Sequence, residues 1–182
     1  MAILKKGLVQ VYTGKGKGKT TAAFGLALRM LGAAGRVYIC QFLKPPDLVT
    51  GESQLAEDFA ENLTLERVEQ EWDMRTSLSD PQKVEQMRQA IAEKLSQIKH
   101  LVREGKYDLV ILDEIVFCLS ENLADWEDVT TIISNRAQHV ELVLTGRGAD
   151  QKLIELADLV TEMQPVKHPW HQGVGARKGI EY

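Results

Sequence analysis

Short apolar runs alternate with helical patterns along the whole chain. Six runs are rich in apolar and β-forming residues, and we expect each to be a strand: 7–13, 36–43, 63–68, 107–112, 139–145 and 158–163. Residues 107–112 (YDLVIL) are apolar almost throughout, which is typical of a strand covered on both faces of a parallel sheet.

The segments between these runs favour helices, which we expect at 21–31, 53–61, 80–104, 126–136 and 151–157. In the longest, a capping residue and a proline open the helix, and apolar side chains then recur every three or four residues. Strands separated by helices imply right-handed crossovers. We therefore predict an α/β fold, one domain over residues 1–182, with helices on both faces of a mostly parallel sheet. A ligand site belongs at the carboxyl ends of its strands.

Composition and charge narrow the functional classes. The 182 residues are 44% hydrophobic, which is enough for a full core. The 22 basic residues are outnumbered by 26 acidic ones, so the chain lacks the basic surplus of a nucleic-acid-binding protein. No apolar run approaches the roughly 20 residues of a membrane span, and the first residues lack a signal-peptide core. Two cysteines fit a reducing compartment. We expect a cytoplasmic protein without nucleic-acid or membrane partners.

A glycine- and lysine-rich turn, TGKGKGKTT, lies between the first strand and the first helix. Its glycines let backbone N–H groups converge on one anion, and the helix N-terminus adds positive potential. Its three lysines would repel one another unless a polyanion lay among them. We expect a nucleotide triphosphate here, with the Thr20 hydroxyl on a magnesium ion. The binding residues are expected to be Gly14, Lys15, Gly16, Lys17, Gly18, Lys19, Thr20 and Thr21. A flexible turn before a helix is the alternative.

Two carboxylates, Asp113 and Glu114, directly follow the apolar run at 107–112. At the carboxyl end of a strand they are placed to hold Mg²⁺, directly or through water, beside the phosphates. In a hydrolase, Glu114 could instead orient a water molecule; a surface turn is the third interpretation. The loop and the acidic pair together indicate a nucleotide and magnesium, and they leave motors, kinases and other transferases open.

Further segments discriminate among these classes. They are VLTGR at 143–147, LIELADLVTEM at 153–163 and GARKGIEY at 175–182. Together with the loop at 14–21 and ILDE at 111–114, they closely resemble the P-loop type of ATP:corrinoid adenosyltransferase, over nearly the whole chain. Thr13 stands where the general pattern G-x-x-x-x-G-K-[ST] has glycine, which makes the loop one residue shorter. This short form is the one that the family uses.

The resemblance implies transfer of the 5′-deoxyadenosyl group of ATP to the cobalt of a cob(I) corrinoid, with release of triphosphate. Because the C5′–O bond breaks, no general base is required, and negative charge accumulates on the leaving group. Loop N–H groups, Lys17, Lys19 and Mg²⁺ would stabilise that charge, so we expect both lysines to be catalytic. Thr20 and the pair Asp113 and Glu114 are the expected metal ligands.

The corrinoid side of the site departs from the family pattern. Trp72 falls where the family has an aromatic residue near the cobalt, or else packs on the core; two positions earlier, Gln70 replaces another aromatic residue. The turn at 44–46 reads Lys-Pro-Pro in place of Lys-Gly, so we expect a differently shaped loop. Arg147 is expected to reach phosphate or ribose, or to form a surface salt bridge. The tail at 165–182 is expected to complete the site.

The resemblance also implies a homodimer and a reduced flavoprotein that supplies electrons to the corrinoid. Two other classes of protein remain open from the loop alone. One is a P-loop ATPase or small-molecule kinase, and the other is a nucleotide-sensing binding module.

Overall fold

Six strands form one sheet in the computed structural model, which describes residues 2–74 and 76–181. They are β1 (Val9–Thr13), β2 (Val37–Gln41), β3 (Leu63–Arg67), β4 (Leu109–Asp113), β5 (Glu141–Thr145) and β6 (Leu159–Glu162). Their order in the sheet is β3-β2-β4-β5-β1-β6, and every neighbouring pair is parallel. The prediction of a parallel α/β sheet is confirmed.

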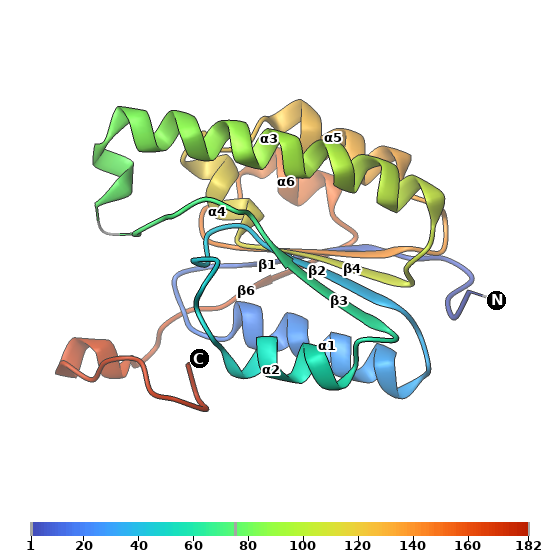
Figure 1. The fold of residues 1–182 in the computed structure, drawn as a ribbon, viewed down its shortest axis with the longest axis horizontal. Helices are drawn as coiled ribbons and strands as arrows, with labels where there is room; N and C mark the ends of the chain where they lie inside the picture. The colour runs from blue at the N-terminus through green and yellow to red at the C-terminus, as the bar shows by residue number, and fades with distance from the viewer. Residues whose placement is uncertain (1, 75, 182) are drawn as a thin grey trace.

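Helices cover both faces of this sheet, as predicted. The helices are α1 (Lys19–Gly32), α2 (Gly51–Asp58), α3 (Pro81–Glu104), α4 (Ile115–Ser120), α5 (Trp126–Asn135) and α6 (Gln151–Leu156), with 3₁₀ turns η1 (Ser77–Ser79) and η2 (Pro169–Gln172). Figure 1 shows α1 and α2 on one face and α3, α4, α5 and α6 on the other. Within the described part of the chain, no helix is long and apolar enough to span a bilayer.

The sequence signals at the ends of α3 act as expected. The Asp80 carboxylate accepts the backbone N–H groups of Gln82 at 3.0 Å and Lys83 at 3.3 Å, and Pro81 occupies the first turn. Gly105 ends the helix at φ 64°, a left-handed conformation that glycine adopts readily. One face of α3 is buried in the core, through Met87, Ile91, Leu95, Ile98 and Val102. The helix is therefore held by its apolar stripe, which packs towards α5.

Helix α4 has no counterpart among the sequence-based predictions. Its six residues, IVFCLS, are mostly apolar, and four of them are buried. Such a segment has no polar face and therefore no helical period, so it reads as an extension of the preceding strand. Strand β4 ends because the next residue, Glu114, takes φ 69° and turns the chain. Helix α2 begins two residues before the predicted start, where Thr50 and Ser53 form a capping box.

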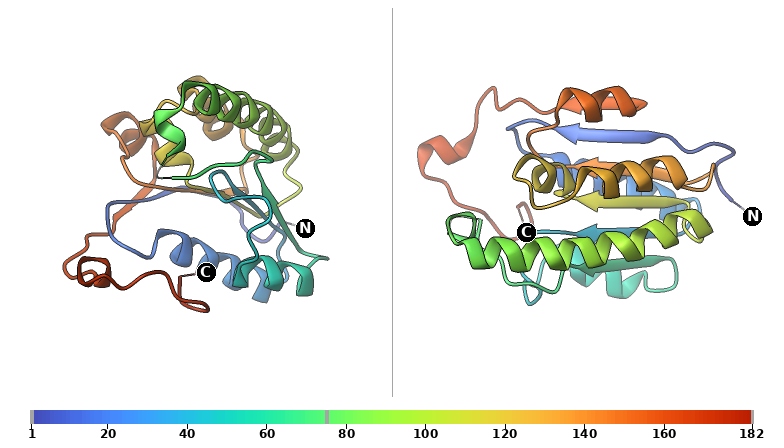
Figure 2. Two further views of the ribbon diagram at one scale, coloured as in Figure 1. Left: turned by 60° about the vertical axis from the view of Figure 1, so that its left-hand side comes forward. Right: turned by 90° about the horizontal axis from the view of Figure 1, so that it is seen from above.

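All six strands point the same way, so their carboxyl ends meet at one edge of the sheet. The tail after β6 runs to this same edge, as the right-hand view of Figure 2 shows. The loops after β1, β2, β4 and β5 also lie there, which brings the motifs at 14–21 and 113–114 together. The core lies on either side of the sheet and contains the free thiols of Cys40 and Cys118.

Candidate active site

The loop between β1 and α1 is tied to the chain that follows β6. The Gly16 N–H donates to the Met163 carbonyl at 2.7 Å, and the Met163 N–H donates to the Thr13 carbonyl at 2.9 Å. A Cβ at Gly16 would lie 2.7 Å from the Met163 oxygen, so only glycine fits. Gly14 and Gly18 have φ 96° and 118°, which bend the loop in the way that side chains disfavour. The short loop is thus a defined turn at the N-terminus of α1.

Lys19, the first residue of α1, directs its ammonium group into this loop. Its Nζ donates to the carbonyls of Gly14 and Gly16, each at 2.9 Å, and the residue is 8% exposed. Burial lowers the pKa of Lys19, while the nearby Glu114 carboxylate opposes that shift. Both hydrogen bonds go to neutral carbonyl groups. The loop therefore holds a positive charge that is largely shielded from water and is suited to a polyanion.

Asp113, the last residue of β4, collects hydrogen bonds from three elements. Its carboxylate accepts the Thr20 hydroxyl at 2.9 Å, the Thr145 hydroxyl at 2.7 Å and the Gln41 amide at 3.4 Å. Burial raises the pKa of this carboxyl, and the three donors work against that shift. Asp113 therefore fixes the Thr20 hydroxyl in place. A carboxylate in this position can bind a metal ion through water while it orients the direct ligand.

Glu114 presents a carboxylate oxygen that lacks a protein partner. Its Oε2 atom is buried and accepts no hydrogen bond from the described residues. Burial raises the pKa of Glu114, and the neighbouring Asp113 raises it further, whereas Lys19 lowers it. The Glu114 N–H donates to the Thr145 hydroxyl at 2.9 Å, which holds the left-handed turn. A buried, unpartnered carboxylate oxygen is costly by itself, so these residues fit a divalent cation.

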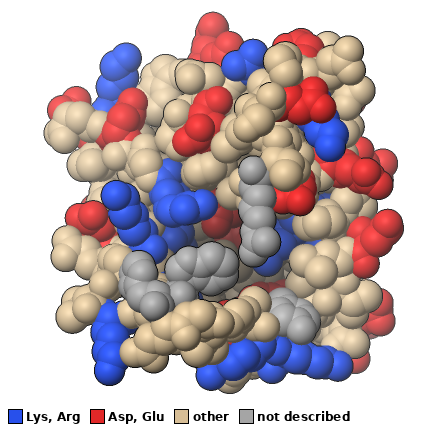
Figure 3. Space-filling view, turned by 90° about the vertical axis from the view of Figure 1, so that its left-hand side faces the viewer, with Lys and Arg blue, Asp and Glu red and all other residues tan. Residues whose placement is uncertain are grey.

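A cavity of about 210 Å³ lies between the loop and Glu114. It is lined by Lys17, Gly18, Lys19, Thr20, Thr21, Lys44, Glu52, Glu114, Ile180 and Glu181. Figure 3 looks onto this edge of the molecule, where lysine and arginine side chains gather about the middle of the face. The cavity is lined by three lysines and three glutamates, and one of the glutamates, Glu114, has an unpartnered carboxylate oxygen. A complex of magnesium and triphosphate needs both kinds of charge.

Four further lining residues were not named individually as site residues from the sequence. Lys44 lies in the turn at 44–46, where a differently shaped loop was expected, and Glu52 lies in the first turn of α2. Ile180 and Glu181 belong to the tail that was expected to complete the site. Lys44 could have been found from its place just after a strand, at the edge where Asp113 lies. Thr145 was also missed, because a hydroxyl at a strand end carries no motif of its own.

Six predicted site residues lie outside the cavity lining. Gly14 and Gly16 shape the loop and Asp113 holds Thr20; the others are Trp72, Arg147 and Lys15. Trp72 is 5% exposed, packs with the core and donates its indole N–H to the Met74 sulphur at 3.3 Å. This arrangement matches the core-packing interpretation, and a contact with a corrinoid stays a prediction. Arg147 is exposed, with its guanidinium 5.1 Å from the centre of the Phe117 ring. Its charge nonetheless acts on Lys19 and Glu114, as the pKa shifts of both indicate. Lys15 is exposed.

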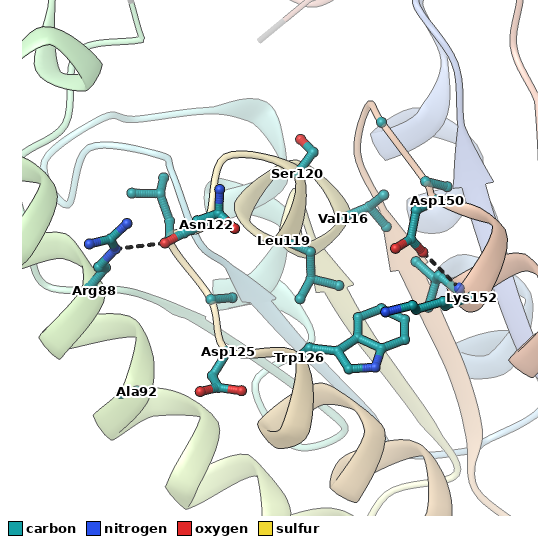
Figure 4. A pocket seen from close by; sticks show the side chains of 15 residues that line it. Arg88, Ala92, Val116, Leu119, Ser120, Asn122, Asp125, Trp126, Asp150 and Lys152 are labelled. Carbon is teal, nitrogen blue, oxygen red and sulfur yellow. Dashed lines mark hydrogen bonds between the residues drawn. The ribbon is translucent and has the colours of Figure 1, made fainter.

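A larger cavity, of about 580 Å³, lies on the face covered by α3, α4, α5 and α6 (Figure 4). Its polar residues already serve the fold. The Arg88 Nε donates to the Asn122 carbonyl at 2.6 Å, while Asp125 and Asp150 cap α5 and α6. None of its lining residues belongs to the phosphate loop or the acidic pair. This cavity is larger than the one at the sheet edge but lacks its chemistry, so volume alone does not identify the site.

Comparisons with known proteins agree with this geometry. The family model described as ATP:corrinoid adenosyltransferase BtuR/CobO/CobP matches residues 5–182. The corrinoid adenosyltransferase of Escherichia coli K12 is 34% identical over 178 residues, covering 98% of this chain and 87% of that protein. The one from Sinorhizobium is 37% identical over 184 residues, covering 98% and 81%. The corrinoid adenosyltransferase CobA of Salmonella typhimurium LT2 is 32% identical over 178 residues, covering 98% and 87%.

Among solved structures, a KaiC-like protein from Pyrococcus horikoshii OT3 aligns with 89% of this chain and 74% of its own, at 14% identity and a TM-score of 0.49. That likeness is too distant to bear on function. The match to the family model spans both the phosphate loop and the acidic pair. The chain therefore belongs to the BtuR/CobO/CobP family of ATP:corrinoid adenosyltransferases.

Proposed function

We propose that the protein transfers the 5′-deoxyadenosyl group of ATP to the cobalt of a corrinoid reduced to cob(I), and releases inorganic triphosphate. The observation that carries this proposal is the buried Lys19 ammonium, held inside a glycine-rich loop that faces the Glu114 carboxylate. This arrangement suits a triphosphate with a metal ion. Membership of the adenosyltransferase family supports the corrinoid as the acceptor.

The reaction balances without an acid or a base from the protein. The electron pair on cob(I) forms the bond to C5′, the C5′–O bond breaks, and its electron pair leaves on triphosphate. Cobalt is thereby oxidised by two electrons. The chain has to stabilise charge on the leaving group and to hold C5′ in line with the metal. We assign the first task to the N–H groups of 14–20 other than that of Gly16, which the Met163 carbonyl accepts, together with Lys17 and Lys19, which line the cavity.

We assign the metal to Thr20 and Glu114, with Asp113 behind them. Support comes from the unpartnered Oε2 of Glu114 and from the Thr20 hydroxyl that Asp113 fixes. A bound Mg²⁺ would supply positive charge to the phosphate oxygens. The donor set consists of carboxylate and hydroxyl oxygens, which this hard cation prefers.

The remaining parts of the proposal concern the corrinoid and the tail. We assign the tail at 165–182 to closure of the site, because Ile180 and Glu181 line the cavity. Arg147 acts on the triphosphate or the ribose, and its influence on the pKa of Lys19 supports that nearness. Trp72 would reach the macrocycle only after its segment leaves the core. A homodimer, a separate reduced flavoprotein and a cytoplasmic location complete the proposal.

The test uses purified protein with chemically reduced corrinoid, ATP and Mg²⁺. The absorption spectrum is followed in the dark and again after illumination, and the phosphate products are identified. We expect a light-sensitive organocobalt product and one triphosphate for each corrinoid consumed. ADP or orthophosphate formed without corrinoid would instead indicate an ATPase or kinase, and tight ATP binding without turnover would indicate a binding module.

A further inference from the structure

The loop between β2 and α2 contains two adjacent prolines, Pro45 and Pro46, which supply carbonyl acceptors but no N–H donors. Within the loop, the Pro45 carbonyl accepts the Leu48 N–H at 3.2 Å. Arg67, the last residue of the edge strand β3, supplies further donors. Its Nη1 donates to the carbonyls of Pro45 at 3.2 Å, Pro46 at 3.1 Å and Leu48 at 2.5 Å. Its Nη2 lies 3.4 Å from the Thr50 hydroxyl, which caps α2.

The same guanidinium also begins a row of hydrogen bonds along the sheet edge. Its Nε donates to the Gln41 side-chain oxygen at 3.1 Å, and the Gln41 amide donates to Asp113 at 3.4 Å. Asp113 in turn accepts the hydroxyl of Thr145 at 2.7 Å. This row crosses the carboxyl ends of β3, β2, β4 and β5, which are neighbours in the sheet. Hydrogen bonds therefore connect Arg67 to Asp113, the neighbour of Glu114, although Arg67 itself does not line the cavity.

The loop that Arg67 holds carries residues of the cavity at both of its ends. Lys44 precedes the two prolines and lines the cavity, and Glu52 lies just after the Thr50 cap. The charge of Lys44 lowers the pKa of both Asp113 and Glu114, so its ammonium group acts on the acidic pair. The shape of the loop consequently decides where this positive charge lies.

We propose that Arg67 is a positioning residue for adenosyl transfer: its guanidinium fixes the loop at 44–50 and thereby holds Lys44 in the phosphate cavity. This inference rests on the proposed function, because it takes the cavity to be the ATP site. The role requires arginine, whose planar fork of five N–H donors reaches several acceptors at once. A lysine has one point charge on a flexible stem and cannot span the same carbonyls.

The decisive experiment is a double-mutant cycle on ATP binding, measured by calorimetry with Mg²⁺ and without corrinoid. We expect Arg67→Lys and Lys44→Ala each to weaken ATP binding about tenfold. In the Lys44→Ala background, Arg67→Lys should weaken binding by less than twofold further, because its effect passes through Lys44. The proposal would be overturned if Arg67→Lys weakened ATP binding by the same factor in the wild type and in Lys44→Ala. It would also be overturned if Arg67→Lys left the ATP affinity of the wild type unchanged.

A second measurement distinguishes a local effect on the loop from a general loss of stability. Hydrogen exchange of the amides in 43–53 should accelerate at least tenfold in Arg67→Lys, while the amides of β1 and β4 keep their wild-type protection. Unchanged exchange in the loop, or a uniform acceleration throughout the sheet, would contradict the assigned role. Arg67→Gln, which also lacks the charged fork, is expected to give the same pattern.

The matched control is Arg88→Lys. Arg88 also binds a backbone carbonyl, that of Asn122 at 2.6 Å, but it lines the cavity on the opposite face of the sheet. Its ATP affinity should equal that of the wild type. Because these measurements need no corrinoid, a failed adenosylation assay would overturn the proposed function and leave the effect of Arg67 on ATP binding measurable by itself.

Discussion

At the scale of single residues, the candidate site depends on charges that are held out of water. Lys19 has both its hydrogen bonds on loop carbonyls, and Glu114 keeps one carboxylate oxygen without a partner among the described residues. The first feature attracts a polyanion and the second a cation. The sequence was sufficient to identify both residues, because a glycine-rich loop and an acidic pair after an apolar strand are local patterns. It was not sufficient for Thr145, whose two bonds depend on a neighbouring strand.

Replacement of Lys19 by alanine should abolish most of the transfer. The variant loses the charge nearest the leaving triphosphate, and we expect kcat to fall by about 10²–10³-fold, as when a single stabilising donor is removed elsewhere. Steady-state assays of organocobalt formation measure the effect, with Lys83→Ala, on the exposed side of α3, as the control. A Lys19→Ala enzyme within threefold of the wild type would contradict the proposed electrostatic role.

Glu114→Gln should separate metal binding from nucleotide binding. The amide keeps the shape of the side chain but removes the charge that a divalent cation needs. In thermal unfolding, we expect ATP with Mg²⁺ to raise the Tm of the wild type more than ATP with a chelator does. In Glu114→Gln this difference should disappear. Should the variant keep the full Mg²⁺-dependent rise in Tm, Glu114 is not a metal ligand.

Asp108 lies at the edge of the sheet opposite the candidate site, and its surroundings predict that the stability of the fold depends on pH. It accepts the N–H groups of Ile3 and Arg36, each at 2.9 Å. Burial raises the pKa of this carboxyl, but the hydrogen bonds from Arg36 and Ile3 outweigh it, so the net pKa is lowered from 3.8. A lowered folded-state pKa means that the carboxylate stabilises the fold above about pH 4, and that this contribution is lost as the pH falls through the folded pKa.

Accordingly, Asp108→Asn should lower the free energy of unfolding by about 1–3 kcal/mol at pH 7, the cost of an unsatisfied buried polar group. Urea titrations of both proteins between pH 7 and pH 3 measure the difference. We expect the gap to narrow only below about pH 4. A gap that is constant down to pH 3 would show that the carboxylate charge is not the cause.

At the scale of elements, predictability followed the kind of signal that each segment carries. In helix α3, Asp80 and Pro81 mark the start and Gly105 marks the end. The spacing of its apolar residues indicates which face is buried. Helix α4 lacks all of these, because it is buried around most of its circumference and follows a residue, Glu114, with φ 69° and no capping side chain. Its formation is decided by the packing around it, which a local pattern cannot reveal.

Shortening one side chain in the buried face of α3 tests whether this face stabilises the fold without acting on the site. Leu95 is fully buried, so Leu95→Ala should destabilise the protein by about 2–5 kcal/mol through lost burial and a residual cavity. Chemical denaturation gives the change. Below the unfolding transition, we expect the affinity for ATP to stay within twofold of the wild type, because α3 supplies none of the cavity residues. A larger loss of affinity would mean that α3 acts on the site.

At the scale of the whole molecule, the order of the strands assembles the site. Strand β5 lies between β1 and β4, so Thr145 at its end stands between the phosphate loop and Asp113. The tail returns to the same edge, where Ile180 and Glu181 line the cavity (Figures 1 and 2). Alternating strands and helices predict a parallel sheet, but they do not determine which strands are neighbours. The contributions of Lys44, Thr145 and Arg67 therefore became visible only in three dimensions.

The most direct test of the central claim is to find which bond of ATP breaks. ATP carrying ¹⁸O in the bridge between C5′ and the α-phosphorus is incubated with the enzyme, Mg²⁺ and reduced corrinoid, and the products are analysed by mass spectrometry. Attack at C5′ predicts that all of the ¹⁸O appears in inorganic triphosphate, with one triphosphate for each organocobalt product. Label retained in ADP, with unlabelled orthophosphate released, would show attack at phosphorus and would contradict adenosyl transfer.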